Sequence, residues 1–130
     1  MHENEIARIV VDTAYRIHST LGPGLLESVY EVVLAYELRK QGLEVQREES
    51  IPLRWESLLF EESFRADLIV AGKLIVEVKS VEKLSPVHKK QLLTYLRLAN
   101  IKLGLLINFG DYYIKDGISR VIHGELDLEA

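Results

Sequence analysis

The stretch FRADLIV-AGK-LIVEVKS, residues 64–80, decides the fold of this chain. Two apolar runs rich in β-branched residues flank a short break that contains glycine, and this pattern predicts a β-hairpin. Side chains alternate between the two faces of a strand, so Glu77 and Lys79 point to the same side as Ile75. The second strand is therefore expected to carry a polar edge on one face and a purely apolar opposite face.

The register of this hairpin depends on the length of its loop. A three-residue loop, 71–73, pairs Asp67 with Glu77 and Arg65 with Lys79 on one face. The other face then contains only the apolar pairs Val70–Leu74, Leu68–Val76 and Ala66–Val78. A loop one residue shorter would mix polar and apolar side chains on both faces. Turn chemistry alone does not decide between them, but burial of one face selects the three-residue register.

In this register the Cβ atoms of Asp67 and Glu77 lie about 5 Å apart. Like charges this close raise one pKa unless a cation lies between them. Carboxylate oxygens suit Mg²⁺ or Mn²⁺, and the backbone carbonyl of Val78 would add another hard oxygen. Lys79 would then orient or deprotonate a water, or stabilise charge on a phosphate. A surface pair of acids offset by Arg65 and Lys79 explains the same residues equally well.

Composition limits the class of function. The chain of 130 residues, 48% hydrophobic and 28% charged, is expected to form one globular domain over residues 1–130. The absence of cysteine excludes disulfides and thiolate zinc sites and favours a reducing, cytoplasmic location. The first residues lack a signal-peptide layout, and no apolar run approaches the roughly 20 residues of a membrane span, so no membrane partner is expected. The net charge of −4 argues against strong nonspecific nucleic-acid binding, but not against an enzyme whose acids are neutralised by metal.

The order of the predicted elements indicates the fold class. Apolar spacing, Gly42 and Pro86 predict helices over 4–20, 25–41 and 85–100. Strands are predicted over 43–53, 58–62, 64–70, 74–80, 103–109 and 118–123, with a short extended piece at 112–115. We expect an α/β fold with a mixed sheet: two N-terminal helices, an antiparallel three-stranded β-meander, a helix and further strands. The acidic tail, 124–130, is expected to fray.

The second predicted helix has an apolar stripe that we expect to face the core, formed by Leu26, Val29, Val33 and Leu34. Glu27, Tyr30 and Glu31 flank this stripe. An acid in the first turn, such as Glu27, suits the helix dipole, and on local grounds this role is sufficient. Trp55, in the turn 55–57, is expected to be partly packed rather than to serve as a platform for stacked bases.

The third predicted helix carries polar residues in two groups. Gln91 and Tyr95 are one turn apart and share a face, where they would hold a phosphate or the attacking water, or form a hydrogen-bonded pair at the rim of the core. Lys89 and Lys90, with Lys83 nearby, would contact a phosphate backbone. A solvated helix face explains the lysines equally simply.

The segment Gly24-x-x-Glu27-x-x-Tyr30 matches the signature of the GxxExxY proteins. The chain resembles this family over nearly its whole length. That family is similar to the PD-(D/E)XK nuclease superfamily. The resemblance implies a restriction-endonuclease-like core: a helix, three antiparallel strands, a helix and a fourth strand. It also implies that Asp67 binds metal, that residues 77–79 are the (D/E)xK element, and that Glu27 is the helix glutamate that completes the metal site.

The same resemblance bears on substrate contacts. Gln91 and Tyr95 resemble the QxxxY element that RecB-like and related nucleases carry on the following helix. Tyr30 would contact substrate or pack against the sheet beside the site. Ala66 stands where the name-giving proline of the superfamily would be, and this departure leaves the metal ligands untouched.

The function implied is a Mg²⁺- or Mn²⁺-dependent phosphodiesterase that cuts nucleic acid, with DNA as the expected substrate. Glu27, Asp67 and Glu77 would hold the metal, and a metal-bound water assisted by Lys79 would attack phosphorus in line. The alternative is a catalytically silent nuclease-fold module that binds nucleic acid or serves as a subunit of a larger complex. A purely structural dimerisation domain is a third reading. Two copies paired as a homodimer would present a continuous groove.

Overall fold

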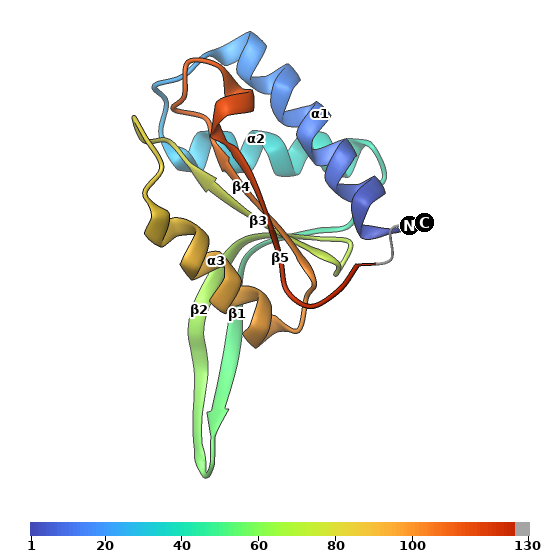
Figure 1. The fold of residues 1–130 in the computed structure, drawn as a ribbon. Helices are drawn as coiled ribbons and strands as arrows, with labels where there is room; N and C mark the ends of the chain where they lie inside the picture. The colour runs from blue at the N-terminus through green and yellow to red at the C-terminus, as the bar shows by residue number, and fades with distance from the viewer. Residues whose placement is uncertain (127–130) are drawn as a thin grey trace.

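A five-stranded sheet with the order β1-β2-β3-β4-β5 forms the centre of the fold (Figure 1). The computed structural model describes residues 1–126. The strands are β1 (Val45–Trp55), β2 (Leu58–Val70), β3 (Leu74–Lys79), β4 (Leu103–Asn108) and β5 (Ile118–Ile122). The helices are α1 (Glu3–Leu21), α2 (Glu27–Lys40), α3 (Pro86–Ala99) and the short 3-10 helix η1 (Ile114–Gly117). None of these helices, within residues 1–126, has the length and apolar character needed to cross a membrane.

The sheet is mixed, as the sequence predicts. Strands β1, β2 and β3 form an antiparallel meander, β3 and β4 run parallel, and β5 is antiparallel to β4. The parallel β3–β4 step is bridged by α3, which is the usual crossover between parallel strands. The predicted α/β architecture of two helices, a meander, a helix and further strands is confirmed.

The β2–β3 hairpin has the register predicted for a three-residue loop. Its pairs are Leu68–Val76, Ile69–Ile75 and Val70–Leu74. Ala71 and Gly72 in the loop have φ values of +52° and +66°, which close the turn. The predicted pairing of Arg65 with Lys79 is wrong, because the β2–β3 ladder ends at Leu68–Val76. Arg65 instead pairs with Ser50 of β1.

Two hydrophobic clusters cover the two faces of the sheet. Helices α1 and α2 contribute to the cluster that contains Leu68, Val70, Leu74, Val76 and Val78. Helix α3 contributes Leu92 and Leu96 to the cluster that contains Ile69 and Ile75. Ala66 belongs to the α3-side cluster, so the predicted pair of Ala66 with Val78 on the other face is wrong. Beyond Leu68, β2 no longer follows β3, and the two strands cease to share a common alternation.

The buried side of α2 differs from the predicted stripe. Of the predicted stripe, Leu34 is buried and Val33 is partly buried against the core, but Leu26 and Val29 are exposed. The other buried residues are Tyr30, Glu31, Ala35 and Leu38. The apolar residues of this segment surround the helix, so spacing alone did not identify the inner side. The Tyr30 ring decides it by stacking on Phe109, with 4.5 Å between ring centroids.

The loop that precedes α2 is braced by Tyr30. Gly22 and Gly24 have φ values of +72° and +105°, a region that glycine enters without steric cost. The Tyr30 hydroxyl donates a hydrogen bond to the Gly22 carbonyl at 2.5 Å and accepts one from the Leu25 N–H at 3.1 Å. Gly24 and Tyr30 thus form one local unit that sets the start of α2 and the position of Glu27.

Two further predicted elements differ in the structure. Strand β2 is continuous over residues that the sequence divides into 58–62 and 64–70. The predicted extended piece at 112–115 is wrong, because Ile114–Gly117 form η1 and bury Ile114. The predicted fraying of the tail falls in part on residues 127–130, which lie outside the described residues.

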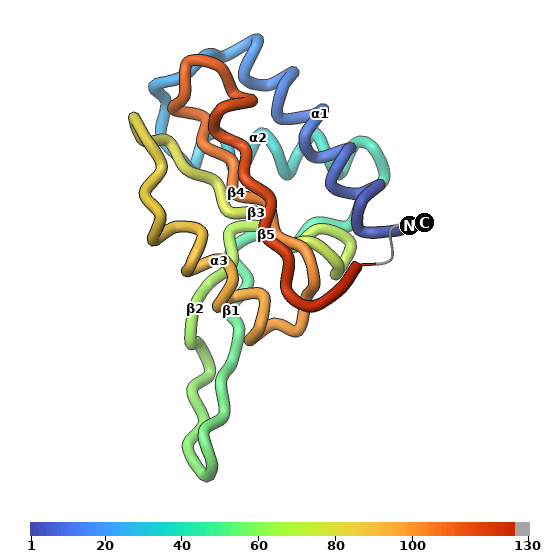
Figure 2. Tube along the Cα trace, in the orientation of Figure 1, coloured from blue at the N-terminus to red at the C-terminus, as the bar shows by residue number. Residues whose placement is uncertain are grey.

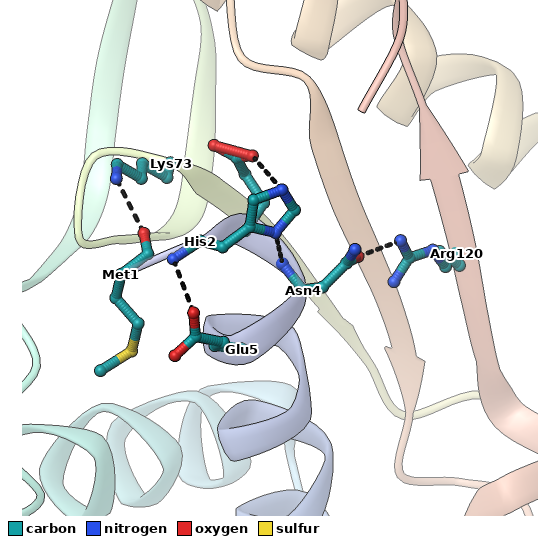
Figure 3. Close-up of polar contacts among 7 residues, drawn as sticks. Met1, His2, Asn4, Glu5, Lys73 and Arg120 are labelled. Carbon is teal, nitrogen blue, oxygen red and sulfur yellow. Dashed lines mark hydrogen bonds and ion pairs between the residues drawn. The ribbon is translucent and has the colours of Figure 1, made fainter. Parts of the chain in front are cut away.

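The start of α1 is tied to two distant segments (Figure 3). His2 caps the helix, with its Nδ1 atom accepting a hydrogen bond from the Asn4 N–H at 3.0 Å. The Lys73 Nζ atom, in the β2–β3 loop, donates to the Met1 carbonyl at 2.7 Å. Arg120 of β5 donates to the Asn4 side chain. These contacts hold the N-terminal end of α1 against the sheet, on the side away from α3.

Replacing Tyr30 with phenylalanine should destabilise the fold, because the Gly22 carbonyl and the Leu25 N–H lose their partner. These bonds are partly buried, and a typical hydrogen bond contributes about 0.5–1.5 kcal/mol, so we expect a loss of about 1 kcal/mol in the free energy of unfolding, measured by urea denaturation. Tyr36→Phe, on the exposed side of the same helix, is the control and should change nothing. Equal stability of Tyr30→Phe and wild type would contradict the bracing role.

Candidate active site

Three acidic residues form a row across β1, β2 and β3. The β1–β2 pairs on either side of Glu48 place it opposite Asp67. The position that follows the last β2–β3 pair places Asp67 opposite Glu77. We call Glu48, Asp67 and Glu77 the acidic row. It lies where β2 separates from β3, so side chains and not backbone ladders fill this part of the sheet.

The carboxylates of Asp67 and Glu77 each bind a backbone N–H group of the neighbouring strand. The Asp67 N–H donates to Glu77 Oε2 at 2.8 Å, and the Val78 N–H donates to Asp67 Oδ2 at 2.8 Å. Each carboxylate therefore accepts a backbone hydrogen bond from the opposite strand. These two bonds replace the next step of the ladder and fix the point at which the strands part.

The cost of this arrangement is electrostatic. Glu77 is 7% exposed, and burial together with the charge of Asp67 raises its pKa to about 8. Burial also raises the pKa of Asp67, and the nearby Glu48 and Glu27 add to the effect. Lys79 opposes both shifts through its positive charge without cancelling them. The row therefore favours a bound proton or a bound cation over bare carboxylates.

A fourth acid reaches the row from α2. Carboxylate oxygens of Glu31, Glu48 and Asp67 lie within 4.8 Å of one another. Glu31 is buried, and its Oε2 atom accepts a hydrogen bond from the Arg47 guanidinium at 3.0 Å. Burial and the neighbouring Glu48 carboxylate raise the pKa of Glu31 to about 7, against the lowering effect of Arg47. Helix α2 thus supplies a carboxylate from a separate layer of the fold.

Glu48 joins this cluster through an unusual backbone conformation. Its φ of +52° lies in the left-handed region, which costs a residue with a Cβ atom about 1–2 kcal/mol. Strict alternation along β1 would send Arg47 and Glu48 to opposite faces, whereas both lie close to Glu31. Backbone strain of this kind concentrates at functional sites, and here it adds a carboxylate to the cluster.

Glu27, predicted to complete a metal site, lies in the first turn of α2 and is exposed. Its Oε2 atom accepts a hydrogen bond from the Ser80 N–H at 3.4 Å, and the Ser80 hydroxyl donates to the Leu25 carbonyl at 2.6 Å. Glu27 thereby joins the start of α2 to the end of β3, beside an open cleft lined by residues 23–28 and 80–82. Among the described residues, the cluster that converges within 4.8 Å includes neither Glu27 nor Glu77.

Lys79 ends β3 and is half-buried. It pairs in register with Asn108 of β4, and its carbonyl accepts a hydrogen bond from the Phe109 N–H at 2.8 Å. The buried Asn108 amide then binds both the N–H and the carbonyl of Val81, at 2.9 and 2.8 Å. The backbone that carries Lys79 is thus held on both sides while its ammonium group remains near the acidic row.

Helix α3 brings Tyr95 close to the row. Its ring stacks on Phe64 of β2, with 4.0 Å between centroids and an interplanar angle of 4°. Burial and the negative charges of Glu77 and Asp67 raise the pKa of Tyr95, so its hydroxyl keeps its proton at neutral pH. Gln91, one turn earlier on the helix, is exposed.

The remaining predicted substrate residues fall in different surroundings. Lys89 and Lys90 line an open groove at the start of α3 together with Lys83, and Asp111 lies in the same groove. Tyr30 is fully buried and its hydroxyl is engaged by the loop before α2. Packing therefore accounts for Tyr30, whereas the lysines lie on accessible surface.

Two members of the acidic cluster were not among the predicted site residues. Glu31 was placed beside the core stripe of its helix, and Glu48 belongs to a charged run that is typical of a solvent-exposed strand. The signal for Glu48 lies in the strand register, since a β1 strand paired antiparallel to β2 brings one of its acids opposite Asp67. No comparable signal was present for Glu31, because its position depends on which side of α2 is buried.

Comparison with known proteins identifies the family to which the chain is similar. A family model described as the PD-(D/E)XK nuclease superfamily matches residues 4–121 of the chain. The matched range runs from α1 to β5 and includes all four acids of the cluster and row. No curated protein and no solved structure matches the chain significantly.

In the absence of divalent ions, the free energy of unfolding should fall as the pH rises from about 5 to about 8. Glu77 titrates at its ordinary pKa of 4.5 when unfolded and at about 8 when folded, so the folded state retains a proton that the unfolded state has lost. The stabilisation is complete below pH 4.5 and is lost as the pH passes through 8. One pKa unit is worth about 1.4 kcal/mol, so this shift corresponds to an overall loss of up to about 5 kcal/mol.

Urea denaturation in EDTA at several pH values measures this effect. Glu77→Gln, which keeps the shape of the neutral acid, should flatten the dependence on pH. A wild-type protein whose stability is constant, or rises, between these pH values would contradict the assigned electrostatics. So would an unchanged slope in Glu77→Gln.

Proposed function

The chain belongs to the PD-(D/E)XK nuclease superfamily, and from this premise we propose that it is a divalent-metal-dependent phosphodiesterase that cuts nucleic acid, with DNA as the first candidate substrate. One observation carries the proposal. Acidic side chains from β1, β2, β3 and α2 gather where β2 and β3 part, and two of them have pKa values raised to about 8 and about 7 by burial and mutual repulsion. We also propose membership of the GxxExxY group, which the local unit formed by Gly24, Glu27 and Tyr30 supports.

The donor atoms fit a hard cation. Mg²⁺ and Mn²⁺ prefer carboxylate and carbonyl oxygens, and the chain has no cysteine to offer a softer ligand. Asp67 and Glu77 would be the principal ligands, with the Val78 carbonyl as a further oxygen. Their raised pKa values support this assignment, because a cation relieves the same repulsion that a proton relieves.

Two residues of α2 are candidates for a carboxylate ligand of the metal. Glu27 is the residue indicated by the sequence motif, and it is hydrogen-bonded to the backbone just after Lys79. Glu31 lies one helical turn further on and already converges with Glu48 and Asp67. We assign Glu31 and Glu48 as additional ligands that share the cluster with Asp67, and Glu27 as the ligand on the open, cleft side.

The remaining residues have roles that follow from charge and position. A bound ion would polarise a phosphoryl oxygen and lower the pKa of a water molecule. The Lys79 ammonium, next to the row, would stabilise negative charge on the phosphate as it is attacked. Tyr95, which keeps its proton, would donate a hydrogen bond to a phosphate oxygen, with Gln91 on the same helix face. Lys89 and Lys90 would contact phosphates further along the nucleic acid.

The ion pair between Arg47 and Glu31 favours a second candidate function. The guanidinium already neutralises one acid of the cluster without an external cation. This arrangement is compatible with a module that binds nucleic acid, alone or within a larger complex, and does not cut it. Binding without cleavage in the assay below would support this second function.

Glu77→Ala and Lys79→Ala should each reduce cleavage by at least about 100-fold, the usual effect of losing an electrostatic group at a reacting centre. The assay uses labelled single-stranded, double-stranded and branched DNA and RNA with Mg²⁺ or Mn²⁺, and with EDTA as the blank. Thermal melting should remain near wild type for Lys79→Ala, and for Glu77→Ala, which leaves the Asp67 N–H without its acceptor, it checks that the variant is folded. Lys102→Ala, at an exposed lysine of the α3–β4 connection, is the control and should retain activity. Wild-type cleavage by either site variant would contradict the proposed mechanism.

A further inference from the structure

The β1–β2 hairpin continues beyond the body of the protein as an arm (Figures 1 and 2). Its contact with the body ends at Ile51 and Phe64, which pack in the α3-side cluster beside Tyr95. We call residues 52–62 the arm. Its apolar side chains belong to neither of the two hydrophobic clusters of the described chain.

The strand register places four apolar side chains of the arm on one face. Leu53 pairs with Phe60 and Trp55 pairs with Leu58, and alternation puts both pairs on the same face. We call these four residues the arm face. Trp55, Leu58 and Phe60 are 66%, 55% and 50% exposed. The expectation that Trp55 is partly packed at its turn is therefore wrong.

An exposed apolar surface such as the arm face is typical of an interaction site. A two-stranded hairpin is marginally stable in water unless one face is covered. Contiguous exposed apolar residues mark interaction sites, and tryptophan is a frequent anchor of interfaces. The middle pair, Arg54 with Leu59, points to the opposite face and provides an internal comparison.

We propose that the arm face is the contact between two copies of this chain, packed face to face about a two-fold axis. A two-fold axis places each residue against the same patch of its partner, which an uncharged face tolerates and a charged face does not. The arm face carries no charge, and the charged side chain nearest to it on β1, Arg54, points to the opposite face of the hairpin.

Nucleic acid is the less favoured occupant. The arm has one arginine against the three acids Glu56, Glu61 and Glu62, and a net negative surface repels phosphates. Edge-to-edge strand addition is also disfavoured, because Pro52 removes a donor from β1 and charged residues occupy the outer edge of β2. The remaining geometry is packing of one apolar face on another.

The area of the arm face determines the affinity expected for the dimer. Fully covered aromatic side chains bury about 150–250 Å² each, and those of the arm face are already partly covered, so two arm faces with their leucines would bury less than about 1,000 Å² in total. Specific interfaces of this size lie at the low end of the range and are transient. We therefore expect a reversible dimer with micromolar affinity. Because the arm begins next to Glu48 and Asp67, pairing would also carry two acidic rows on one particle.

Sedimentation over a concentration series tests the proposal without reference to cleavage. Wild-type protein should pass from monomer to dimer, whereas Leu58→Glu and Phe60→Glu should remain monomeric. Leu59→Glu is the matched control, since Leu59 is 54% exposed on the other face of the same hairpin, and it should dimerise normally. Circular dichroism checks that each variant is folded.

The tryptophan gives an independent readout, because Trp55 is the single tryptophan of the chain. Its emission should shift to the blue as the wild-type concentration rises and remain unshifted in Leu58→Glu. A wild-type protein that is monomeric at millimolar concentration would overturn the proposal. So would a dimer that Leu59→Glu disrupts as strongly as Leu58→Glu, or a Trp55 emission that shifts only when DNA is added.

Discussion

The structure depends on how two neighbouring carboxylates, Asp67 and Glu77, are accommodated in a largely buried position. Each accepts a hydrogen bond from the backbone of the opposite strand, and this exchange replaces the ladder where β2 and β3 part. The exchange satisfies the backbone, but burial, together with the neighbouring charge of Asp67, raises the pKa of Glu77 to about 8. The surrounding elements converge on this charge. Strand β1 and helix α2 add further acids, while Lys79 partly offsets them.

The hairpin and its register were predictable from the sequence because a local constraint decides them. One face of the hairpin must be apolar, and a single loop length satisfies that requirement. The point where the ladder ends was not predictable, and the Arg65–Lys79 and Ala66–Val78 pairs were therefore wrong. The buried side of α2 was predicted only in part, for a similar reason. Apolar residues surround that helix, and its buried side is the one on which Tyr30 stacks on the distant ring of Phe109 and Glu31 pairs with Arg47.

The acids of the site likewise divide into those that the local register predicts and those that only the tertiary packing places. The placement of Asp67 opposite Glu77 follows from the hairpin register alone. Glu48 required the β1–β2 register and a left-handed backbone, and Glu31 required the packing of α2. The same hairpin carries both main features of the molecule, since its base holds Glu48 and Asp67 and its outer part is the arm. The acidic residues at the base and the exposed tip thus belong to one continuous pair of strands.

The central claim is that the acidic row holds protons which a divalent cation displaces. Calorimetric titration with Mg²⁺ or Mn²⁺ at pH 7, repeated in buffers of different ionisation enthalpy, measures binding and proton release together. The account predicts saturable binding with release of about one proton per ion, because Glu77 with a pKa of about 8 is protonated at that pH. Absence of binding at millimolar metal, or binding without proton release, would contradict it.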